Sequence, residues 1–270
     1  MPTMRVNGAE LYFEDTGGEG VPIVFGHGLL WSGRMFDAQV AALRDRYRCV
    51  TFDFRGQGRS QVTRDGYDMD TLAQDAAALI EALELAPCHF AGLSMGGFIG
   101  MRLAARRPEL LRSLILLETA ADAEPAENVP KYRRFMLAAR VLGTGAVASR
   151  VMPIMFSRTF LSDPARAAER AEWQRRAATN HRVGVTLATA GVIERLPVED
   201  ELGRIQLPTL VIHGEEDVAV VPERAKRTAE RIAGARLVMV PRAGHTSTVE
   251  EPVAVTGAIE TFLREIGSGA

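Results

Sequence analysis

Two patterns of apolar positions alternate along the first 120 residues of the chain. Short runs that are apolar throughout, or that alternate with polar residues, predict strands, and apolar residues at every third or fourth position predict helices. The predicted strands are Glu10–Glu14, Pro22–Phe25, Tyr47–Phe52, Cys88–Ala91 and Leu111–Leu117. The predicted helices are Arg34–Arg44, Asp70–Leu85 and Met95–Arg106. Because unbroken apolar strands separated by helices must be covered on both faces, this order predicts a parallel sheet in an α/β fold.

The pattern changes between about residue 120 and residue 200, where strand signals disappear and helical spacing continues. The predicted helices in this stretch are Lys131–Leu142, Ala146–Phe156, Pro164–Asn180 and Gly184–Arg195. Predicted strands and helices then alternate again. The strands are Thr209–Ile212 and Arg236–Val240, and the helices are Pro222–Ile232 and Val253–Ile266. We therefore expect an α/β core domain made of residues 1–119 and 201–270, with a helical cap inserted at residues 120–200.

Composition and charge narrow the class of protein. Of the 270 residues, 47% are hydrophobic and 24% are charged, which is typical of a globular domain. The 32 Lys and Arg residues are balanced by 34 Asp and Glu residues, so we expect no nucleic-acid partner. No apolar run approaches the ~18 residues of a membrane span, and the N-terminus lacks a signal-peptide pattern. We therefore expect a cytoplasmic protein that does not bind membranes.

The cysteines and histidines give no sign of a metal centre. Cys49 and Cys88 both lie in apolar strand-like runs, which predicts buried free thiols. Two cysteines are too few for a disulfide framework, and no cluster of cysteine and histidine has the spacing of metal ligands. We expect no metal and no cofactor.

The string Gly92-Leu93-Ser94-Met95-Gly96-Gly97 carries the strongest chemical signal. It follows a predicted strand and opens a predicted helix, which is the context of a nucleophile elbow. Such a turn strains the serine backbone and requires small residues two positions to either side, which Gly92 and Gly96 provide. Ser94 is therefore the predicted nucleophile, and the start of the following helix faces the position of a developing oxyanion.

A serine nucleophile needs a histidine as general base, and the loop histidine His245 is the best candidate. It follows the last predicted strand, and catalytic groups of open α/β sheets gather at the carboxyl ends of strands. The other histidines fit structural roles in strands, loops or the helical insertion better, and they are His27, His89, His181 and His213.

The acid that orients the histidine is expected after the strand Thr209–Ile212. Asp217 is our choice there, since the order Ser94, Asp217, His245 matches one fold class with this elbow. Glu216 is an immediate alternative, and Glu118 is a second one because it also ends a predicted strand.

An oxyanion needs two hydrogen-bond donors near the nucleophile. The backbone N–H of Met95 is one candidate, because Met95 directly follows Ser94. The N–H of Leu29 is the other, since the Gly26-His27-Gly28-Leu29 loop follows an early strand and its glycines allow close approach of a substrate. His27 then braces this loop.

These residues together resemble the α/β-hydrolase family over nearly the whole chain. The resemblance rests on His27-Gly28, on the tight turn Asp53–Ser60, on the Ser94 elbow, and on Asp217 and His245 in that order. The elbow string and the length of the insertion look most like the branch of 3-oxoadipate enol-lactonases and small esterases. The resemblance implies a mostly parallel eight-stranded sheet flanked by helices, with a helical cap.

The resemblance also implies the activity. It points to a serine hydrolase that cleaves a carboxylic ester or lactone through a Ser-His-Asp triad and an acyl-enzyme, with a small molecule as substrate and no cofactor. Ser94 stands where related dehalogenases and epoxide hydrolases carry aspartate, which argues against both activities. C–C bond hydrolysis, perhydrolysis and a low-turnover ligand receptor stay open as alternatives. The sequence carries no signal for an oligomeric state.

The substrate itself is less constrained. We expect apolar contacts to it from five residues of the loop and the insertion, namely Leu30, Trp31, Phe135, Met155 and Phe156. The stretch from residue 121 to residue 200 carries 12 Lys and Arg against 9 Asp and Glu, with Lys131, Arg133 and Arg134 clustered at one helix start. This local excess raises the hypothesis of an anionic ester or lactone.

Overall fold

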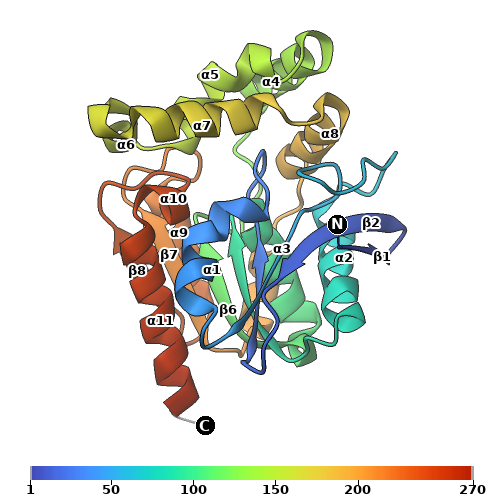
Figure 1. Ribbon diagram of the computed structural model, residues 1–270. Coiled ribbons are helices and arrows are strands. Elements are labelled where there is room, and N and C mark those ends of the chain that lie inside the picture. Colours follow the sequence, from blue (N-terminus) through green and yellow to red (C-terminus); the bar gives the residue numbers. More distant parts are fainter. Residues whose placement is uncertain (1, 269–270) are drawn as a thin grey trace.

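The computed structural model describes residues 2–268, which form one eight-stranded sheet covered by helices (Figure 1). The strands are β1 Thr3–Val6, β2 Ala9–Asp15, β3 Pro22–Gly26, β4 Arg48–Phe52, β5 Cys88–Leu93, β6 Leu111–Leu117, β7 Thr209–Gly214 and β8 Arg236–Val240. Their order in the sheet is β1-β2-β4-β3-β5-β6-β7-β8, and all pairs from β4 to β8 are parallel, whereas β2 is antiparallel to both of its neighbours. The prediction of a mostly parallel eight-stranded sheet is confirmed.

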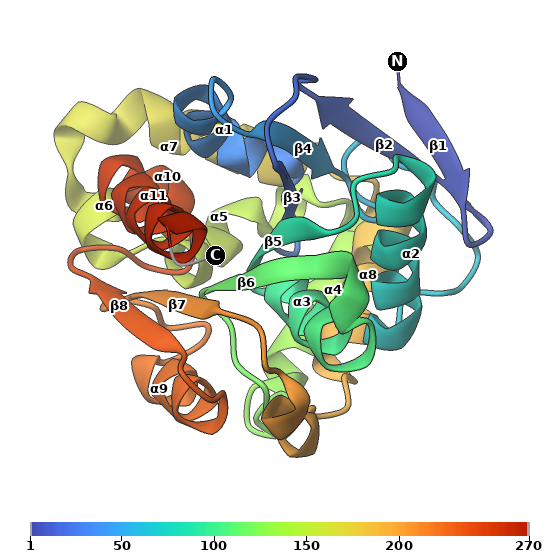
Figure 2. The same cartoon turned by 90° about the horizontal axis from the view of Figure 1, so that it is seen from below.

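Helices cover both faces of this sheet (Figure 2). One face carries α1 Asp37–Leu43 and α11 Pro252–Ser268, and the other carries α2 Met69–Ala82, α3 Met95–Arg106 and α9 Pro222–Arg231. Side chains of β3 show why its sequence does not alternate. Ile23 and Phe25 pack in the core on the α11 side, whereas Val24 packs in the core on the α2 side.

A layer of five helices lies over the edge of the sheet at which the parallel strands end (Figure 1). We call it the α4–α8 layer, and it comprises α4 Val129–Leu142, α5 Gly145–Met155, α6 Arg158–Ser162, α7 Ala167–Ala178 and α8 Arg182–Ile193. The chain segments that lead into and out of it are joined by a hydrogen bond of 2.8 Å from the N–H of Val198 to the carbonyl of Ala121. The core and cap boundaries at residues 120 and 200 stay a prediction.

Several elements differ from the sequence patterns. The segment predicted as one helix at 34–44 is a 3₁₀ turn, Gly33–Phe36, followed by α1, and Asp53 accepts the N–H of Gly33 at the start of this turn at 2.8 Å. The helix that begins at Met69 ends at Ala82, and Glu84 has a φ of 54°. The segment predicted as one helix at 164–180 is a 3₁₀ turn, Pro164–Arg166, followed by α7.

Three short elements gave no readable pattern. They are the strand β1, the helix α6 and a four-residue helix, α10 Ser247–Glu250. The turn before β2 carries the signal that finds β1, since Asn7 and Gly8 have φ values of 45° and 79° and Asn-Gly is a common two-residue hairpin turn. Within residues 2–268, the helices are either too short or too polar to cross a membrane.

Candidate active site

The Gly92–Gly97 string forms a sharp turn between β5 and α3. Ser94 lies at its apex with φ 52° and ψ −110°, a conformation that L-residues rarely adopt. A Cβ on Gly92 would lie 2.2 Å from the carbonyl oxygen of Gly96, and a Cβ on Gly96 would lie 2.0 Å from that of Gly26. Because only glycine fits at these two positions, close packing of β3, β5 and α3 maintains the strained serine.

The side chains of Ser94, His245 and Asp217 form one buried chain of hydrogen bonds. Nε2 of His245 lies 2.8 Å from Oγ of Ser94, and Nδ1 of His245 lies 2.7 Å from Oδ2 of Asp217. Oδ1 of Asp217 accepts the backbone N–H groups of Ala219 at 2.8 Å and Val220 at 3.0 Å. Since an ionised carboxylate only accepts, it favours the imidazole tautomer with a proton on Nδ1, which leaves Nε2 free to accept from the serine.

Neither of the alternative acids is bonded to His245. The carboxylate of Glu216 accepts the N–H of Thr159 at 3.0 Å and its hydroxyl at 2.5 Å, so it ties the loop after β7 to α6. Glu118, at the end of β6, accepts the N–H of Gly214 at 2.8 Å. Of the three acids that the sequence offers, the structure brings only Asp217 to the histidine.

Glu118 is nevertheless close to Asp217, with His213 between them. Oε2 of Glu118 lies 3.4 Å from Nδ1 of His213, and Nε2 of His213 lies 3.5 Å from Oδ2 of Asp217. Burial, and then the charge of Asp217, raise the pKa of Glu118 well above its usual range. Ionisation of Glu118 is therefore less favourable here than in water, and Asp217 is the acid that contacts His245.

The other histidines make structural contacts away from Ser94. His27 donates from Nδ1 to the carbonyl of Gly28 at 2.7 Å and accepts the N–H of Phe54 at 2.9 Å, so it braces the loop after β3. His89 is buried in β5, and His181 caps the start of α8. Their surroundings fit the structural roles that the sequence suggests.

Two backbone N–H groups next to Ser94 have no partner within residues 2–268. They belong to Met95, the first residue of α3, and to Leu29 in the loop after β3. This loop runs close to the serine, since a Cβ on Gly28 would lie 3.6 Å from Cβ of Ser94. Both predicted oxyanion donors are therefore unused by the protein itself.

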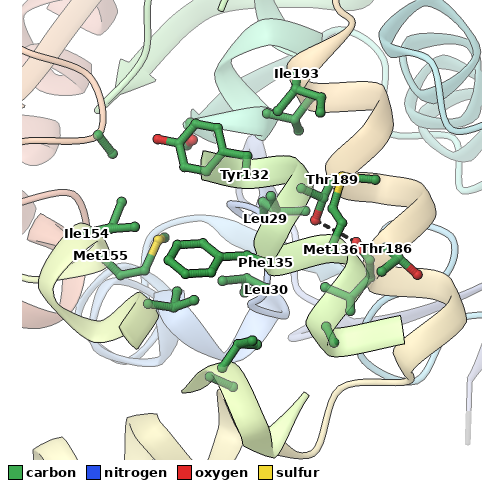
Figure 3. A pocket seen from close by; sticks show the side chains of 18 of the residues that line it. Leu29, Leu30, Tyr132, Phe135, Met136, Ile154, Met155, Thr186, Thr189 and Ile193 are labelled. Carbon is green, nitrogen blue, oxygen red and sulfur yellow. Dashed lines mark hydrogen bonds between the residues drawn. The ribbon is translucent and has the colours of Figure 1, made fainter. Parts of the chain in front are cut away.

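A cavity of about 110 Å³ opens beside Ser94 and His245. Figure 3 shows side chains that line it. Its walls are formed by the loop after β3 and by side chains of α4, α5 and α8, and they are mostly apolar. Three of the five residues expected to contact substrate line it, namely Leu30, Phe135 and Met155.

Trp31 and Phe156 do not line this cavity. Their rings pack against each other with centroids 5.8 Å apart, and Trp31 also packs edge-on against Trp173 at 5.1 Å. Trp31 belongs to the core and the other two belong to the α4–α8 layer, so this aromatic cluster joins the two parts of the molecule. Nothing in the spacing of these residues distinguishes packing from substrate contact.

Comparison with known proteins gives the family. The sequence model of the family described as the alpha/beta hydrolase fold matches residues 21–252. The chain belongs to the α/β-hydrolase family. A thermophilic esterase from Thermogutta terrifontis has a TM-score of 0.91 and 30% identity, over 98% of this chain and 99% of that one.

Two further relatives of this α/β-hydrolase carry other names. The 3-oxoadipate enol-lactonase 2 of Acinetobacter baylyi is 28% identical, over 90% of this chain and 88% of that protein. A bromoperoxidase from Bacillus anthracis has a TM-score of 0.85 and 26% identity, over 95% of this chain and 96% of that one. The resemblance predicted from the sequence is thus confirmed for the family and the fold.

Glu250 supports the site of this hydrolase, although no sequence pattern singled it out. Its Oε1 accepts the N–H groups of Gly244 at 3.0 Å and Thr246 at 3.1 Å, the residues on either side of His245. Its Oε2 accepts the N–H of Ser157 in the α4–α8 layer at 2.8 Å. Burial raises the pKa of this carboxyl group above its ordinary value. Glu250 therefore positions the histidine loop against the helices above it.

Gln57 supports the opposite side of the site. Its Oε1 accepts the N–H of Leu30 at 2.8 Å, and its Nε2 lies 3.6 Å from Sδ of Met95. This side chain connects the two segments that carry the free N–H groups of Leu29 and Met95. The sequence places Gln57 in a structural turn, Asp53–Ser60, and gives no sign of this contact because it depends on how distant loops meet.

Proposed function

We propose that this α/β-hydrolase cleaves a carboxylic ester or lactone through an acyl-enzyme on Ser94. The observation that carries the proposal is the buried chain of hydrogen bonds from Asp217 through His245 to Ser94, which ends at an apolar cavity. Similarity to a protein named an esterase and to one named an enol-lactonase supports the same class of bond.

Acylation begins when Nε2 of His245 takes the hydroxyl proton of Ser94 and Oγ adds to the carbonyl carbon. The N–H groups of Leu29 and Met95 donate to the resulting oxyanion, and Asp217 stabilises the protonated imidazole. The tetrahedral intermediate then collapses and its bond to the leaving oxygen breaks. That oxygen takes the proton from His245 and becomes an alcohol, while the acyl group stays on Ser94.

Deacylation repeats these steps with water. His245 takes a proton from water, and the hydroxide adds to the acyl carbon. Collapse breaks the bond to Oγ, which recovers the proton, and the carboxylic acid is released. A lactone gives one hydroxy acid in place of separate alcohol and acid. We assign the α4–α8 layer, within the predicted cap at 120–200, the role of covering this site, because its residues supply most of the cavity wall.

Perhydrolysis is a second candidate, which the similarity to a protein named a bromoperoxidase favours. In this reaction hydrogen peroxide takes the place of water. His245 takes one of its protons and the oxygen adds to the acyl carbon. The bond to Oγ of Ser94 then breaks, Oγ recovers the proton, and a peracid is released. Peracid formation from an ester and hydrogen peroxide, measured against acid formation in water, separates the two candidates.

The test is release of p-nitrophenolate from p-nitrophenyl acetate by the purified protein. We expect a burst followed by steady turnover, and Ser94→Ala should lower kcat by at least ~10³-fold. Ser162→Ala, which changes an exposed serine of α6, is the matched control and should behave as wild type. A burst without turnover would favour a receptor, and full activity of the Ser94 variant would exclude the proposed nucleophile.

A further inference from the structure

The wall of the cavity carries almost no charge. Among the residues that line it, Glu124 is the single Asp, Glu, Lys or Arg residue. Its carboxylate is already paired, because Oε2 lies 3.0 Å from Nη1 of Arg195 and Oε1 accepts a hydrogen bond from Asn128 at 2.9 Å. Phe98 lines the cavity and covers the guanidinium of Arg195, whose central carbon lies 4.1 Å from the ring centroid. The wall therefore offers no cationic side chain of Lys or Arg to a substrate carboxylate, because Arg195, whose Nε and Nη2 have no partner in the described chain, packs on Phe98 and does not line the cavity.

The basic residues that suggested an anionic substrate lie elsewhere. Lys131, Arg133 and Arg134 are exposed on α4, and none of them lines the cavity. Arg133 pairs instead with the exposed Glu194 at 3.7 Å. Nζ of Lys131 lies 5.7 Å from the ring centroid of Tyr132, but all three side chains are exposed, so their charges are screened by solvent.

Most hydroxyl groups in the wall are also used by the protein. Thr144 donates to the carbonyl of Ala178 at 2.7 Å. Thr186 and Thr189, labelled in Figure 3, donate to carbonyls of their own helix, α8, at 2.9 Å and 2.7 Å. The protons of all three hydroxyls are therefore unavailable to a substrate.

Tyr132 is different. Its side chain reaches the cavity from α4 (Figure 3), and no residue of the described chain, 2–268, makes a hydrogen bond to its hydroxyl. Burial, with smaller contributions from the charges of Glu124 and Asp217, raises the pKa of Tyr132 to about 12, although the charges of Arg195 and Arg224 act in the opposite direction. The phenol therefore keeps its proton and offers it as a neutral donor within electrostatic reach of the triad.

We propose that the cavity takes the acyl group of an uncharged ester or lactone, and that the Tyr132 hydroxyl donates a hydrogen bond to a neutral acceptor on that group. A ketone or ether oxygen fits this description, whereas a carboxylate does not. The inference rests on the proposed ester hydrolysis and adds the class of substrate. It separates this chain from hydrolases whose substrates carry a free carboxylate.

Three p-nitrophenyl esters of nearly equal shape test the inference. Their acyl groups are 5-methylhexanoyl, 5-oxohexanoyl and the monoanion of glutaryl, so an isopropyl, an acetyl or a carboxylate end occupies the same place. Release of p-nitrophenolate gives kcat/KM for each after subtraction of the uncatalysed rate. We expect the anionic ester to be at least ~100-fold poorer than either neutral ester, because an unpaired carboxylate must leave water.

Two variants assign the selectivity to residues. Tyr132→Phe should lower the ratio of kcat/KM for the oxo ester over the methyl ester about tenfold, mainly through KM, because the hydrogen bond is lost. Glu124→Gln should raise the relative rate of the glutaryl ester about tenfold, since the guanidinium of Arg195 loses its charged partner. Glu194→Gln removes the same charge from a side chain that is 64% exposed and should leave all ratios unchanged.

The outcomes are distinguishable. A glutaryl ester hydrolysed as fast as the neutral esters overturns the inference while leaving ester hydrolysis in place. An oxo-to-methyl ratio that Tyr132→Phe does not change overturns the role of the tyrosine, and this arm does not depend on whether the Glu124 variant folds. If wild type hydrolyses none of the three esters faster than Ser94→Ala does, the proposed function fails and this inference fails with it.

Discussion

Replacing Asp217 by asparagine tests which acid orients His245, and the structure fixes the orientation that the new amide adopts. Oδ1 of Asp217 accepts two backbone N–H groups, those of Ala219 and Val220, while Oδ2 faces Nδ1 of His245. The asparagine oxygen must stay with the two backbone donors, so its NH₂ group faces the histidine. The opposite orientation leaves two donors unsatisfied, which costs about 2–6 kcal/mol at 1–3 kcal/mol each.

This orientation reverses the tautomer of the histidine. An NH₂ group donates to Nδ1 of His245, so the ring proton moves to Nε2, which then cannot accept the proton of Ser94. A wrong tautomer of this kind lowers kcat by ~10⁴-fold, which corresponds to about 5 kcal/mol of transition-state stabilisation. Because the change is isosteric, we expect the midpoint of thermal unfolding to move by only a few degrees.

The assay is kcat and kcat/KM for p-nitrophenyl acetate, with thermal unfolding as a check on the fold. Glu118→Gln is the matched control, because Glu118 is buried beside the site and is not bonded to His245. We expect the control to lose less than about tenfold, since Glu118 makes no hydrogen bond to the histidine whose tautomer is at stake. Retention of activity within tenfold in Asp217→Asn, or an equal loss in Glu118→Gln, would refute this reasoning.

Two further predictions concern positioning and pH. Glu250→Gln should lower kcat at least about tenfold and destabilise the fold by about 2 kcal/mol, because the NH₂ group of the glutamine must face a backbone N–H that Glu250 accepts. Glu251→Gln is the control. The ester assay measures the loss of kcat, and urea unfolding measures the loss of stability. Burial, with a smaller contribution from Arg112, lowers the pKa of His89 to about 4. In the unfolded chain the pKa of this histidine is about 6.5. The unfolded state therefore binds this proton first, and up to about 3 kcal/mol of stability is lost as the pH falls from ~6.5 to ~4. Urea unfolding at pH 7 and pH 4.5 should show a smaller loss in His89→Gln; parallel losses in both proteins would contradict the assignment.

The sheet and its long helices were predictable because both faces of the sheet are buried. Five of the seven residues of Leu111–Leu117 are leucine or isoleucine, and helices such as Met95–Arg106 have an apolar face long enough to recognise. The strand β1, with four residues, and the helix α10, also with four, are too short for either period to be visible. The Asn7-Gly8 turn is a local signal that identifies β1, and the pattern of apolar positions alone does not use it.

The candidate site also contains residues that local sequence features predict and residues that they do not. The elbow around Ser94 could be predicted because its glycines and its place between a strand and a helix are local features. The choice of Asp217 over Glu118 and Glu216 rested on the order of Ser94, Asp217 and His245 along the chain, because no local pattern shows which carboxylate the loop after β7 turns toward His245. The positions of Trp31 and Phe156 outside the cavity follow from packing between distant segments, which no local pattern encodes.

Covalent labelling of Ser94 tests the central claim most directly. The purified protein would be treated with a fluorophosphonate, digested and analysed by peptide mass spectrometry, with esterase activity followed in parallel. A serine activated by His245 and Asp217 should take one label per chain, on Ser94, and activity should fall in proportion to labelling, whereas His245→Ala should react far more slowly. Unlabelled Ser94 in active protein, or a label on another residue that accounts for the loss of activity, would contradict the account.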